Sequence, residues 1–323
     1  WVALIGVAFA SFGQSSELSF ASFPTLSPDG KTLVFCYETD LWKADLSTKT
    51  AARLTAMQGN ESRPKISPDG KWIAFTSNQY GSLDVYVMPL TGGEIKQLTF
   101  SEAGERVESW SWDSQKLYIQ SNANNGGTVY TIPVGGGTPK RVFKHFFNRV
   151  HSVAEHPTSG ELFFNDTWES DNQAQRKGYK GEFNPDVQSY NLKTKEYKRY
   201  TDYLGKDMWV TIDRGGKIYF VSDEDNGEYN LYTFENNKKK QLTSFKESIK
   251  YPQVSANGEK IAFEKDYQLW LYDVASKRSE KLAFTVIRNF TLPQSQDFNV
   301  RNSISSFDTA PDNKKLAFVS RGQ

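Results

Sequence analysis

Ser27-Pro28-Asp29-Gly30-Lys31 is repeated forty residues later as Ser67-Pro68-Asp69-Gly70-Lys71. A tight turn needs positive φ at one position, which glycine adopts at little cost, and the proline fixes φ at the corner before it. A short run rich in strand-forming residues follows each copy, Leu33-Val34-Phe35 in the first and Ile73-Ala74-Phe75 in the second. These runs are too short for helices and predict β-strands. The turn therefore begins a repeated β unit.

The remainder of the unit is also repeated. A second apolar and aromatic run follows at Asp40-Leu41-Trp42 in the first copy and at Asp84-Val85-Tyr86-Val87 in the second. A polar segment then closes each copy, on Arg53-Leu54-Thr55 and on Gln97-Leu98-Thr99. Each unit is predicted to be a small antiparallel meander.

Weaker copies of the turn continue along the chain. They are Ser111-Trp112-Asp113-Ser114, Thr158-Ser159-Gly160, Asp213-Arg214-Gly215-Gly216, Ala256-Asn257-Gly258 and Pro311-Asp312-Asn313. The steps between equivalent positions are 40, 44, 46, 56, 42 and 55 residues, and periods of roughly 40 to 50 residues are typical of propeller blades. Six units are complete. We therefore predict an all-β fold in which residues 14–285 form a six-bladed β-propeller of four-stranded antiparallel blades.

Large aromatic residues recur at one position of successive units. They are Trp42, Tyr86, Tyr130, Tyr190, Tyr232 and Trp270. We expect them to fill the wedge between neighbouring sheets, and stacking on a ligand is the alternative. The single cysteine, Cys36, lies in a predicted strand and is expected to be buried as a small apolar residue.

Composition and the N-terminus suggest a compartment. The net charge is +1, from 39 basic and 38 acidic residues. A nucleic-acid-binding protein is expected to have a strongly basic surface, so the charge argues against that class of protein. The apolar run Val2–Ala10 and the small residues after it predict a truncated signal peptide over residues 1–13. That run is too short to span a bilayer, so we expect no membrane insertion and a periplasmic or extracellular location. A first apolar strand is the alternative for this segment.

The sequence predicts neither a catalytic centre nor a metal or cofactor site. The three histidines are His145, His151 and His156. Residues 151 and 156 are five apart at the entrance of a predicted strand, so their side chains would point to opposite faces. No Gly-x-Ser-x-Gly elbow and no P-loop occur in the sequence. We therefore assign no catalytic residue, no metal and no cofactor.

Two sets of residues are candidates for binding. A long insertion from Asp166 to Gly181 in the fourth unit contains Arg176, Lys177 and Tyr179, and propellers place recognition in such loops. A solvated loop is the alternative. Arg63 and Arg106 are assigned to the same position before the turns of the second and third units, from which both would point toward the axial channel. The alternative is that their shared position reflects only the geometry of the repeat and has no role in binding.

Several further segments carry a family resemblance. The insertion Arg176–Phe183, the block Gly205–Trp209 and the strand Ile218–Asp223 resemble bacterial homologues of the tricorn protease. The most specific segments lie near the end of the sequence: Arg288–Leu292, Gln296–Val300, Ile304–Phe307 and Leu316–Gly322. By this resemblance, residues 286–303 form a linker and residues 304–323 begin a second, truncated propeller.

The resemblance implies a role in proteolysis. The full protein would continue through a second propeller and a PDZ domain into a serine peptidase of the C-terminal-processing type, with its catalytic residues beyond residue 323. This propeller would guide or anchor peptides or unfolded polypeptide, and a homo-oligomer is left open. In archaeal members of the family a pair of arginines before the third turn binds the substrate's terminal carboxylate. The matching positions here are Glu105 and Arg106, so one arginine is kept.

The turns alone are less specific than these segments. Similar turns occur in TolB-type propellers and in the propellers of prolyl oligopeptidase relatives. A TolB-like module for protein–protein interaction in the cell envelope, or the propeller of a prolyl-oligopeptidase-type hydrolase, are therefore the alternatives.

Overall fold

The computed structural model describes residues 18–123, 126–144, 149–287 and 300–320, and it divides the chain into two units, residues 1–287 and 288–323. The predicted signal peptide, most of the predicted linker and His145 lie outside the described residues. The predicted boundaries of these segments stay predictions.

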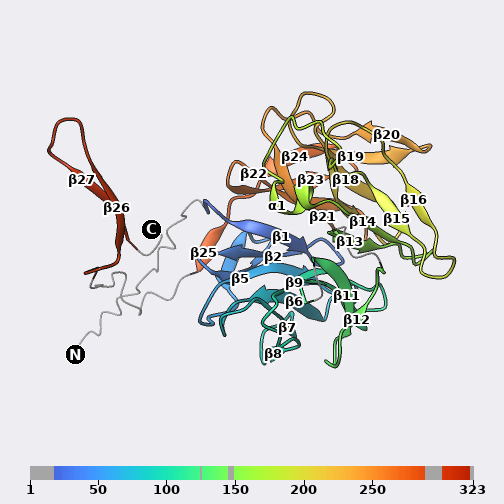
Figure 1. Ribbon diagram of the computed structural model, residues 1–323, viewed down its shortest axis with the longest axis horizontal. Coiled ribbons are helices and arrows are strands. Elements are labelled where there is room, and N and C mark those ends of the chain that lie inside the picture. Colours follow the sequence, from blue (N-terminus) through green and yellow to red (C-terminus); the bar gives the residue numbers. More distant parts are fainter. Residues whose placement is uncertain (1–17, 124–125, 145–148, 288–299, 321–323) are drawn as a thin grey trace, which may run out of the picture. The chain divides into compact units, whose positions relative to one another are not determined.

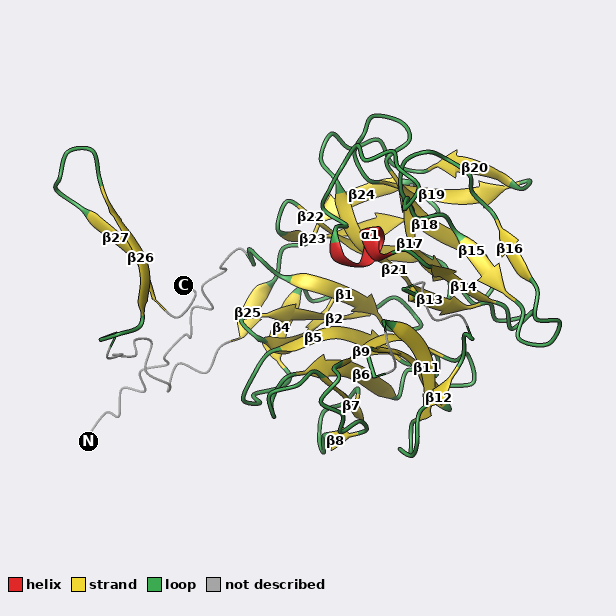
Figure 2. Cartoon of the chain, in the orientation of Figure 1, coloured by secondary structure: helices red, strands yellow, loops and turns green. Residues whose placement is uncertain are grey.

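The described part of the first unit contains six sheets, each with four consecutive antiparallel strands, and one further strand joins the first sheet (Figures 1 and 2). This confirms the predicted fold class. In every sheet the order of the strands in space is their order in the chain. Blades one to three are β1 Ser22–Leu26, β2 Thr32–Tyr37, β3 Asp40–Asp45 and β4 Thr50–Arg53; β5 Glu61–Ile66, β6 Trp72–Ser77, β7 Asp84–Pro89 and β8 Lys96–Gln97; and β9 Glu105–Trp110, β10 Lys116–Ser121, β11 Thr128–Pro133 and β12 Lys140–Arg141. Blades four to six are β13 His151–Glu155, β14 Leu162–Asn165, β15 Gln188–Tyr190 and β16 Tyr197–Arg199; β17 Asp207–Ile212, β18 Ile218–Ser222, β19 Asn230–Glu235 and β20 Lys238–Gln241; and β21 Ile249–Val254, β22 Lys260–Lys265, β23 Gln268–Asp273 and β24 Arg278–Lys281.

The second strand of each blade is buried on both faces because a neighbouring blade covers each side. In β2, Leu33 and Phe35 pack in a cluster with residues of blade six, whereas Val34 and Cys36 pack in a cluster with residues of blade two. Alternate residues of a strand point to opposite faces, so a continuous apolar run is what this position requires. The predicted burial of Cys36 is confirmed, and burial raises the pKa of its thiol.

The recurring aromatic residues fill the space between blades, as predicted. Tyr86, for example, packs in the cluster that joins blades one and two. Five of the six are buried: Trp42, Tyr86, Tyr130, Tyr190 and Tyr232. Trp270 is half-buried against the cluster between blades five and six.

Side chains of the turn itself fix the repeated turns. The Ser27 hydroxyl donates to Asp29 Oδ1 (2.6 Å) and accepts from the Thr32 N–H (2.9 Å), while the Gly30 N–H donates to the Ser27 carbonyl (2.9 Å). The turn joins the first and second strands of a blade, so the sequence-based unit began one strand late. Three of the first strands, β1, β5 and β21, contain proline, and β5 and β9 are rich in polar residues; both features weaken the strand signal.

The ring closes between two complete blades. The innermost strands are neighbours in the cyclic order β1, β5, β9, β13, β17, β21 and back to β1. At the junction of blades six and one, the Phe20 N–H donates to the Tyr267 carbonyl (2.6 Å). After blade six the chain returns to blade one, where β25 Thr285–Ile287 pairs in parallel with β4. The described part of the chain therefore needs no strand exchange between blades to close the ring.

The second unit contains one described hairpin, β26 Ile304–Thr309 and β27 Leu316–Ser320. Its turn has the same bonds as the blade turns: the Ala310 N–H donates to the Lys315 carbonyl and the Asn313 N–H to the Ala310 carbonyl. Phe307 and Phe318 are exposed. The hairpin thus has the form of the two inner strands of a blade.

Replacing a turn glycine tests the backbone argument. Gly70 has φ +73°, and a Cβ there would lie 3.3 Å from Pro28 Cδ of the neighbouring turn. Gly70→Ala should lower the free energy of unfolding by about 1 to 2 kcal/mol, because a left-handed backbone is costly for a residue with a Cβ. Urea denaturation measures this. Gly135→Ala is the control, since its Cβ would enter open space, and an equal loss there would contradict the argument.

Candidate functional site

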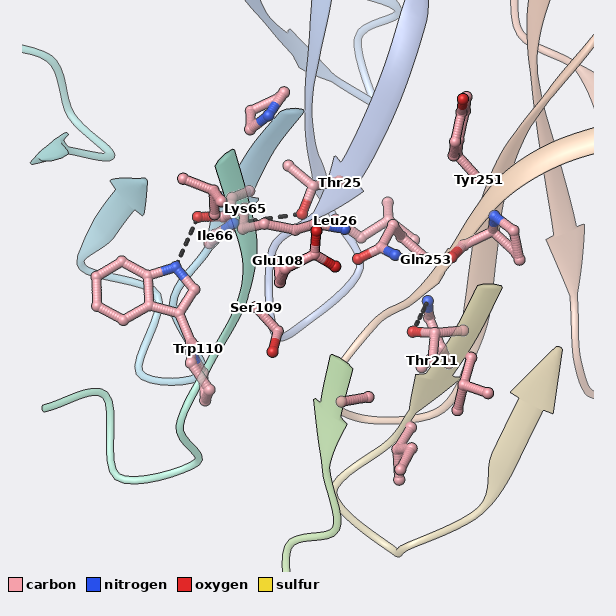
Figure 3. A pocket seen from close by; sticks show the side chains of 18 of the residues that line it. Thr25, Leu26, Lys65, Ile66, Glu108, Ser109, Trp110, Thr211, Tyr251 and Gln253 are labelled. Atoms are coloured by element: carbon pink, nitrogen blue, oxygen red, sulfur yellow. Dashed lines mark hydrogen bonds between the residues drawn. The ribbon is translucent and has the colours of Figure 1, made fainter. Parts of the chain in front are cut away.

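The six innermost strands surround an axial channel. It encloses about 150 Å³, and residues of all six blades line it. Figure 3 shows side chains of different blades around this space, among them Thr25, Lys65, Glu108, Thr211 and Tyr251. Backbone-to-side-chain bonds join neighbouring blades here: the Ile66 N–H donates to Thr25 Oγ1 (3.3 Å) and the Trp110 indole N–H to the Lys65 carbonyl (2.8 Å). The channel is therefore an integral feature of the ring.

Every innermost strand contains a break in its register with the second strand, as expected for a β-bulge. In five blades, one residue at the break has a φ between 50° and 57°. These residues are Phe23, Arg63, Ser152, Trp209 and Tyr251, and all five line the channel. A bulge changes the direction of a side chain, so the bulges determine which side chains lie at this end of the channel.

Side chains of the preceding blade satisfy the backbone N–H groups that several bulges leave unpaired. The Phe23 N–H donates to Glu264 Oε1 (2.6 Å) and the Trp209 N–H to Asn165 Oδ1 (3.2 Å). In blade three the Val107 N–H donates to Thr76 Oγ1 (3.0 Å). Each acceptor lies on the second strand of the blade before it. The bulges thus tie each of these blades to its predecessor.

Aromatic rings and one guanidinium meet at the start of the innermost strands. The Tyr251 ring lies 4.6 Å from that of Phe23 and 4.6 Å from that of Trp209, measured between centroids. The Arg63 guanidinium lies over Phe23 (5.2 Å) and over Tyr251 (5.9 Å). Arg63 therefore lies at the channel, as predicted from the sequence, and its cation faces aromatic rings.

Arg106 and Glu105 lie differently from the prediction. Glu105 pairs with Ser121 just as Glu61 pairs with Ser77. Arg106 therefore corresponds to Ser62, and the predicted equivalence of Arg63 with Arg106 is wrong. Counting back from the equivalent turn positions gives the same result, because Arg63 stands seven residues before Gly70 whereas Arg106 stands eight residues before Ser114.

The side chains of Glu105 and Arg106 have partners within the chain. The buried Glu105 carboxylate accepts from the Ser121 hydroxyl (3.0 Å), and burial raises its pKa. An Arg106 guanidinium nitrogen lies 3.8 Å from Asp171 Oδ1. Arg106 is absent from the channel lining that the described residues form. Whether these two residues bind substrate stays a prediction.

Charges of both signs lie deeper in the channel. Burial raises the pKa of Glu108, an effect that the nearby Arg63 and Lys65 cations oppose. Burial likewise lowers the pKa of Lys65 to about 8, against the attraction of Glu108. The Val153 N–H donates to Glu108 Oε2 (3.4 Å). Both groups are held where their charged forms are poorly solvated.

The insertion of blade four folds into α1 Trp168–Asn172, the single helix of the described residues (Figure 2). Thr167 caps it by accepting from the Ser170 N–H. The Ser170 hydroxyl hydrogen-bonds His151 Nε2 (2.7 Å), and Asp171 pairs with Arg149 (2.9 Å). These contacts fix the helix at the start of β13.

The predicted binding residues of the insertion are also paired within the chain. Arg176 donates twice to Glu169 (2.9 and 2.8 Å) and lies 3.9 Å from the Tyr179 ring centroid. Lys177 pairs with Glu228 of blade five (2.7 Å). Beneath them, Lys206 and Glu169 form an ion pair (3.1 Å) in which both side chains are fully buried. Although the insertion is on the surface, a buried charge pair anchors it.

The histidines that the structure describes serve the fold. His151 is buried and contacts Ser152 and Ser170. His156 Nδ1 accepts from the Thr158 and Ser159 N–H groups at its turn (3.3 and 3.2 Å). No group of side chains suited to a metal ion occurs among the described residues, and none of their helices has the length and apolarity to cross a membrane.

The fold and channel define a six-bladed propeller with short turns at one end, four of which are fixed by a serine side chain. Residues 18–278 match the family described as the tricorn protease N-terminal beta propeller domain, and the chain belongs to this family. It is 24% identical to a tricorn protease homolog of Saccharolobus solfataricus over 316 residues, which cover 91% of this chain and 27% of that protein. It is 30% identical to tricorn protease homolog 1 of Streptomyces coelicolor over 136 residues, which cover 38% of this chain and 13% of that protein.

Solved structures support the same fold. The crystal structure of the tricorn protease matches with a TM-score of 0.74 at 20% identity, over 94% of this chain and 30% of that chain. TolB from Acinetobacter baumannii matches with a TM-score of 0.57 at 19% identity, over 72% of this chain and 56% of that chain. The chain spans about a quarter or less of the length of the curated tricorn homologues named above.

Sequence reasoning missed the aromatic members of the channel mouth. A signal for two of them is present, because Phe23-Pro24, Arg63-Pro64 and Tyr251-Pro252 each stand at the same distance before the turn glycines at 30, 70 and 258. Proline is tolerated in a strand next to a bulge. Trp209 stands at the same distance before Gly216 but precedes no proline, so only the spacing marks it.

The buried pair under the insertion gives a stability prediction. Lys206→Met should lower the free energy of unfolding by about 3 kcal/mol, because Glu169 would stay buried with less compensation for its charge. Chemical denaturation measures this. The control is Lys240→Met, which breaks the exposed pair with Glu235 and should cost less than about 1 kcal/mol. Similar losses in the two variants would count against a special role for the buried pair.

His151 gives a prediction for pH. Burial lowers its pKa from 6.5 to about 4; Asp171 opposes this, and Arg63 and Arg149 reinforce it. A group whose pKa is depressed on folding stabilises the fold above its unfolded pKa and loses that contribution as the pH falls. The stability difference between the wild type and His151→Gln should therefore shrink between about pH 6.5 and pH 4. Denaturation at several pH values measures it, and a constant difference would refute the assignment.

Proposed function

We propose that this propeller is the non-catalytic part of an exported tricorn-like serine protease, in which it guides or anchors peptides for a peptidase domain elsewhere in the longer protein. The observation that carries the proposal is the axial channel with its aromatic and cationic mouth, in a chain of the tricorn N-terminal propeller family. An extended polypeptide has the backbone oxygens and side chains that such a mouth can bind.

One end of the propeller supports contact with further domains. Large apolar side chains that are 70% to 79% exposed lie in the loops before the first strands and between the second and third strands: Phe20, Tyr80, Phe100, Leu204 and Tyr267. The topology places all of these loops at the end opposite the serine-fixed turns. Clustered exposed apolar residues are typical of interaction surfaces. We assign this end to the downstream propeller, PDZ and peptidase domains.

The experiment compares the 323-residue chain with the complete protein that carries it. The chain alone should bind a fluorescein-labelled unfolded polypeptide such as casein, measured by anisotropy, and leave it intact on a gel. The complete protein should cleave the same substrate, and should lose this activity when its nucleophilic serine is replaced by alanine. Secretion of the complete protein, followed by fractionation, tests the proposed periplasmic or extracellular location.

Each outcome separates the alternatives. Cleavage by the 323-residue chain would overturn the non-catalytic role. Failure of the chain to bind any unfolded polypeptide would overturn the guiding role. The similarity to TolB makes a protein–protein interaction module the second candidate, and a complete protein that lacks peptidase activity but binds a folded envelope protein would favour it.

A further inference from the structure

We propose that Phe23, Arg63, Trp209 and Tyr251 form an aromatic clamp that binds one aromatic or large aliphatic side chain of an extended peptide. In this site Arg63 donates to a carbonyl or carboxylate oxygen next to that side chain. The inference rests on the proposed function for its class of ligand, a peptide in the axial channel. It adds the binding site and the preference of that site.

The first argument is convergence. The four residues come from β1, β5, β17 and β21, and all four line the channel. Tyr251 contacts the rings of both Phe23 and Trp209, at 4.6 Å in each case. The clamp is thus a continuous apolar surface assembled from four blades.

The second argument is backbone conformation. All four residues have φ between 50° and 57°, a region that is costly for bulky side chains and cheap for glycine or asparagine. Elsewhere positive φ occurs at glycines such as Gly30 and in turns at residues such as Lys49 and Asn236, whereas the four clamp residues have it inside strands. Strained residues of this kind cluster at ligand sites. The backbone conformation of the bulges therefore does not explain why bulky side chains occupy these positions.

The third argument concerns the hydrogen-bonding partners of the Arg63 guanidinium. Its guanidinium lies over the Phe23 and Tyr251 rings, and within the described part of the chain no hydrogen bond or ion pair of that guanidinium is recorded. Arg106 and Arg149, by contrast, both face Asp171. A guanidinium stacked on a ring keeps its N–H groups available at the edge. Arg63 can therefore donate to an oxygen of the ligand.

The fourth argument is size. The channel encloses about 150 Å³, and an engineered apolar cavity of about 150 Å³ binds benzene. One phenylalanine or leucine side chain is of this size. Aromatic pairs contribute about 0.5 to 1.5 kcal/mol beyond the burial of their surface, so an aromatic side chain is the preferred occupant.

The test uses the full chain and short fluorescein-labelled Gly-Ser peptides with one central residue, either Phe or Ala. Tyr251→Asn keeps a residue that tolerates positive φ and removes the ring. It should weaken binding of the Phe peptide roughly tenfold, or about 1.4 kcal/mol, and change binding of the Ala peptide little. Tyr197→Asn is the matched control, because Tyr197 is exposed on the outer strand β16 and does not line the channel. Thermal unfolding checks that both variants fold.

Arg63→Gln provides a second test that does not depend on removing a ring. The wild type should bind a peptide with Phe-Glu more tightly than one with Phe-Gln, and this difference should disappear in the variant. A folded Tyr251→Asn variant that binds the Phe peptide like the wild type, or a Phe-Glu preference that survives Arg63→Gln, would overturn the clamp while the guiding role stands. A wild-type chain that binds no peptide of any composition would overturn the guiding role and the clamp together.

Discussion

The ring depends on how the innermost strands of the six blades meet around one axis. Each of these strands is interrupted by a bulge, and a bulge leaves a backbone N–H without a partner in its own sheet. Such a group is costly when buried. Glu264, Thr76 and Asn165 accept these bonds across the blade boundary. The same requirement that joins the blades therefore also directs the bulge side chains toward the channel.

The sequence predicts the fold well because the signals for blades are local. The turn residues of a blade and the apolar run after them lie within about ten residues of each other, and both reflect interactions inside one blade. The first strand of a blade has its partners in two other blades as well as its own. In strands such as β5, with Arg63-Pro64-Lys65, contacts with the other blades determine which residues are used. These strands therefore lack the apolar alternation of an ordinary strand. This is why the predicted unit began one strand late.

The site was less predictable because its parts are distant in the sequence and its details depend on register. Arg63 was found, but its comparison with Arg106 was wrong, since Arg106 stands one residue further from its turn and is paired as Ser62 is. Lys206 and Glu169 look like surface residues in the sequence, and their complete burial follows from the fold of the insertion. The contact of Tyr251 with Phe23 joins blades six and one, so it exists only once the ring has closed.

The two ends of the propeller differ in their loops and in their exposed side chains. At one end, serine side chains fix short turns by hydrogen bonds to the turn itself, and such turns have few groups left for a partner. The other end has the longest loop, the helix α1, the exposed apolar side chains and the mouth where Arg63 lies over aromatic rings. Arg176 and Lys177 of the insertion are held by Glu169 and Glu228, whereas the Arg63 guanidinium at the channel mouth faces aromatic rings. A polypeptide entering or leaving at this end would meet aromatic rings beside the Arg63 guanidinium, and such a surface can contact any sequence that carries a large apolar side chain.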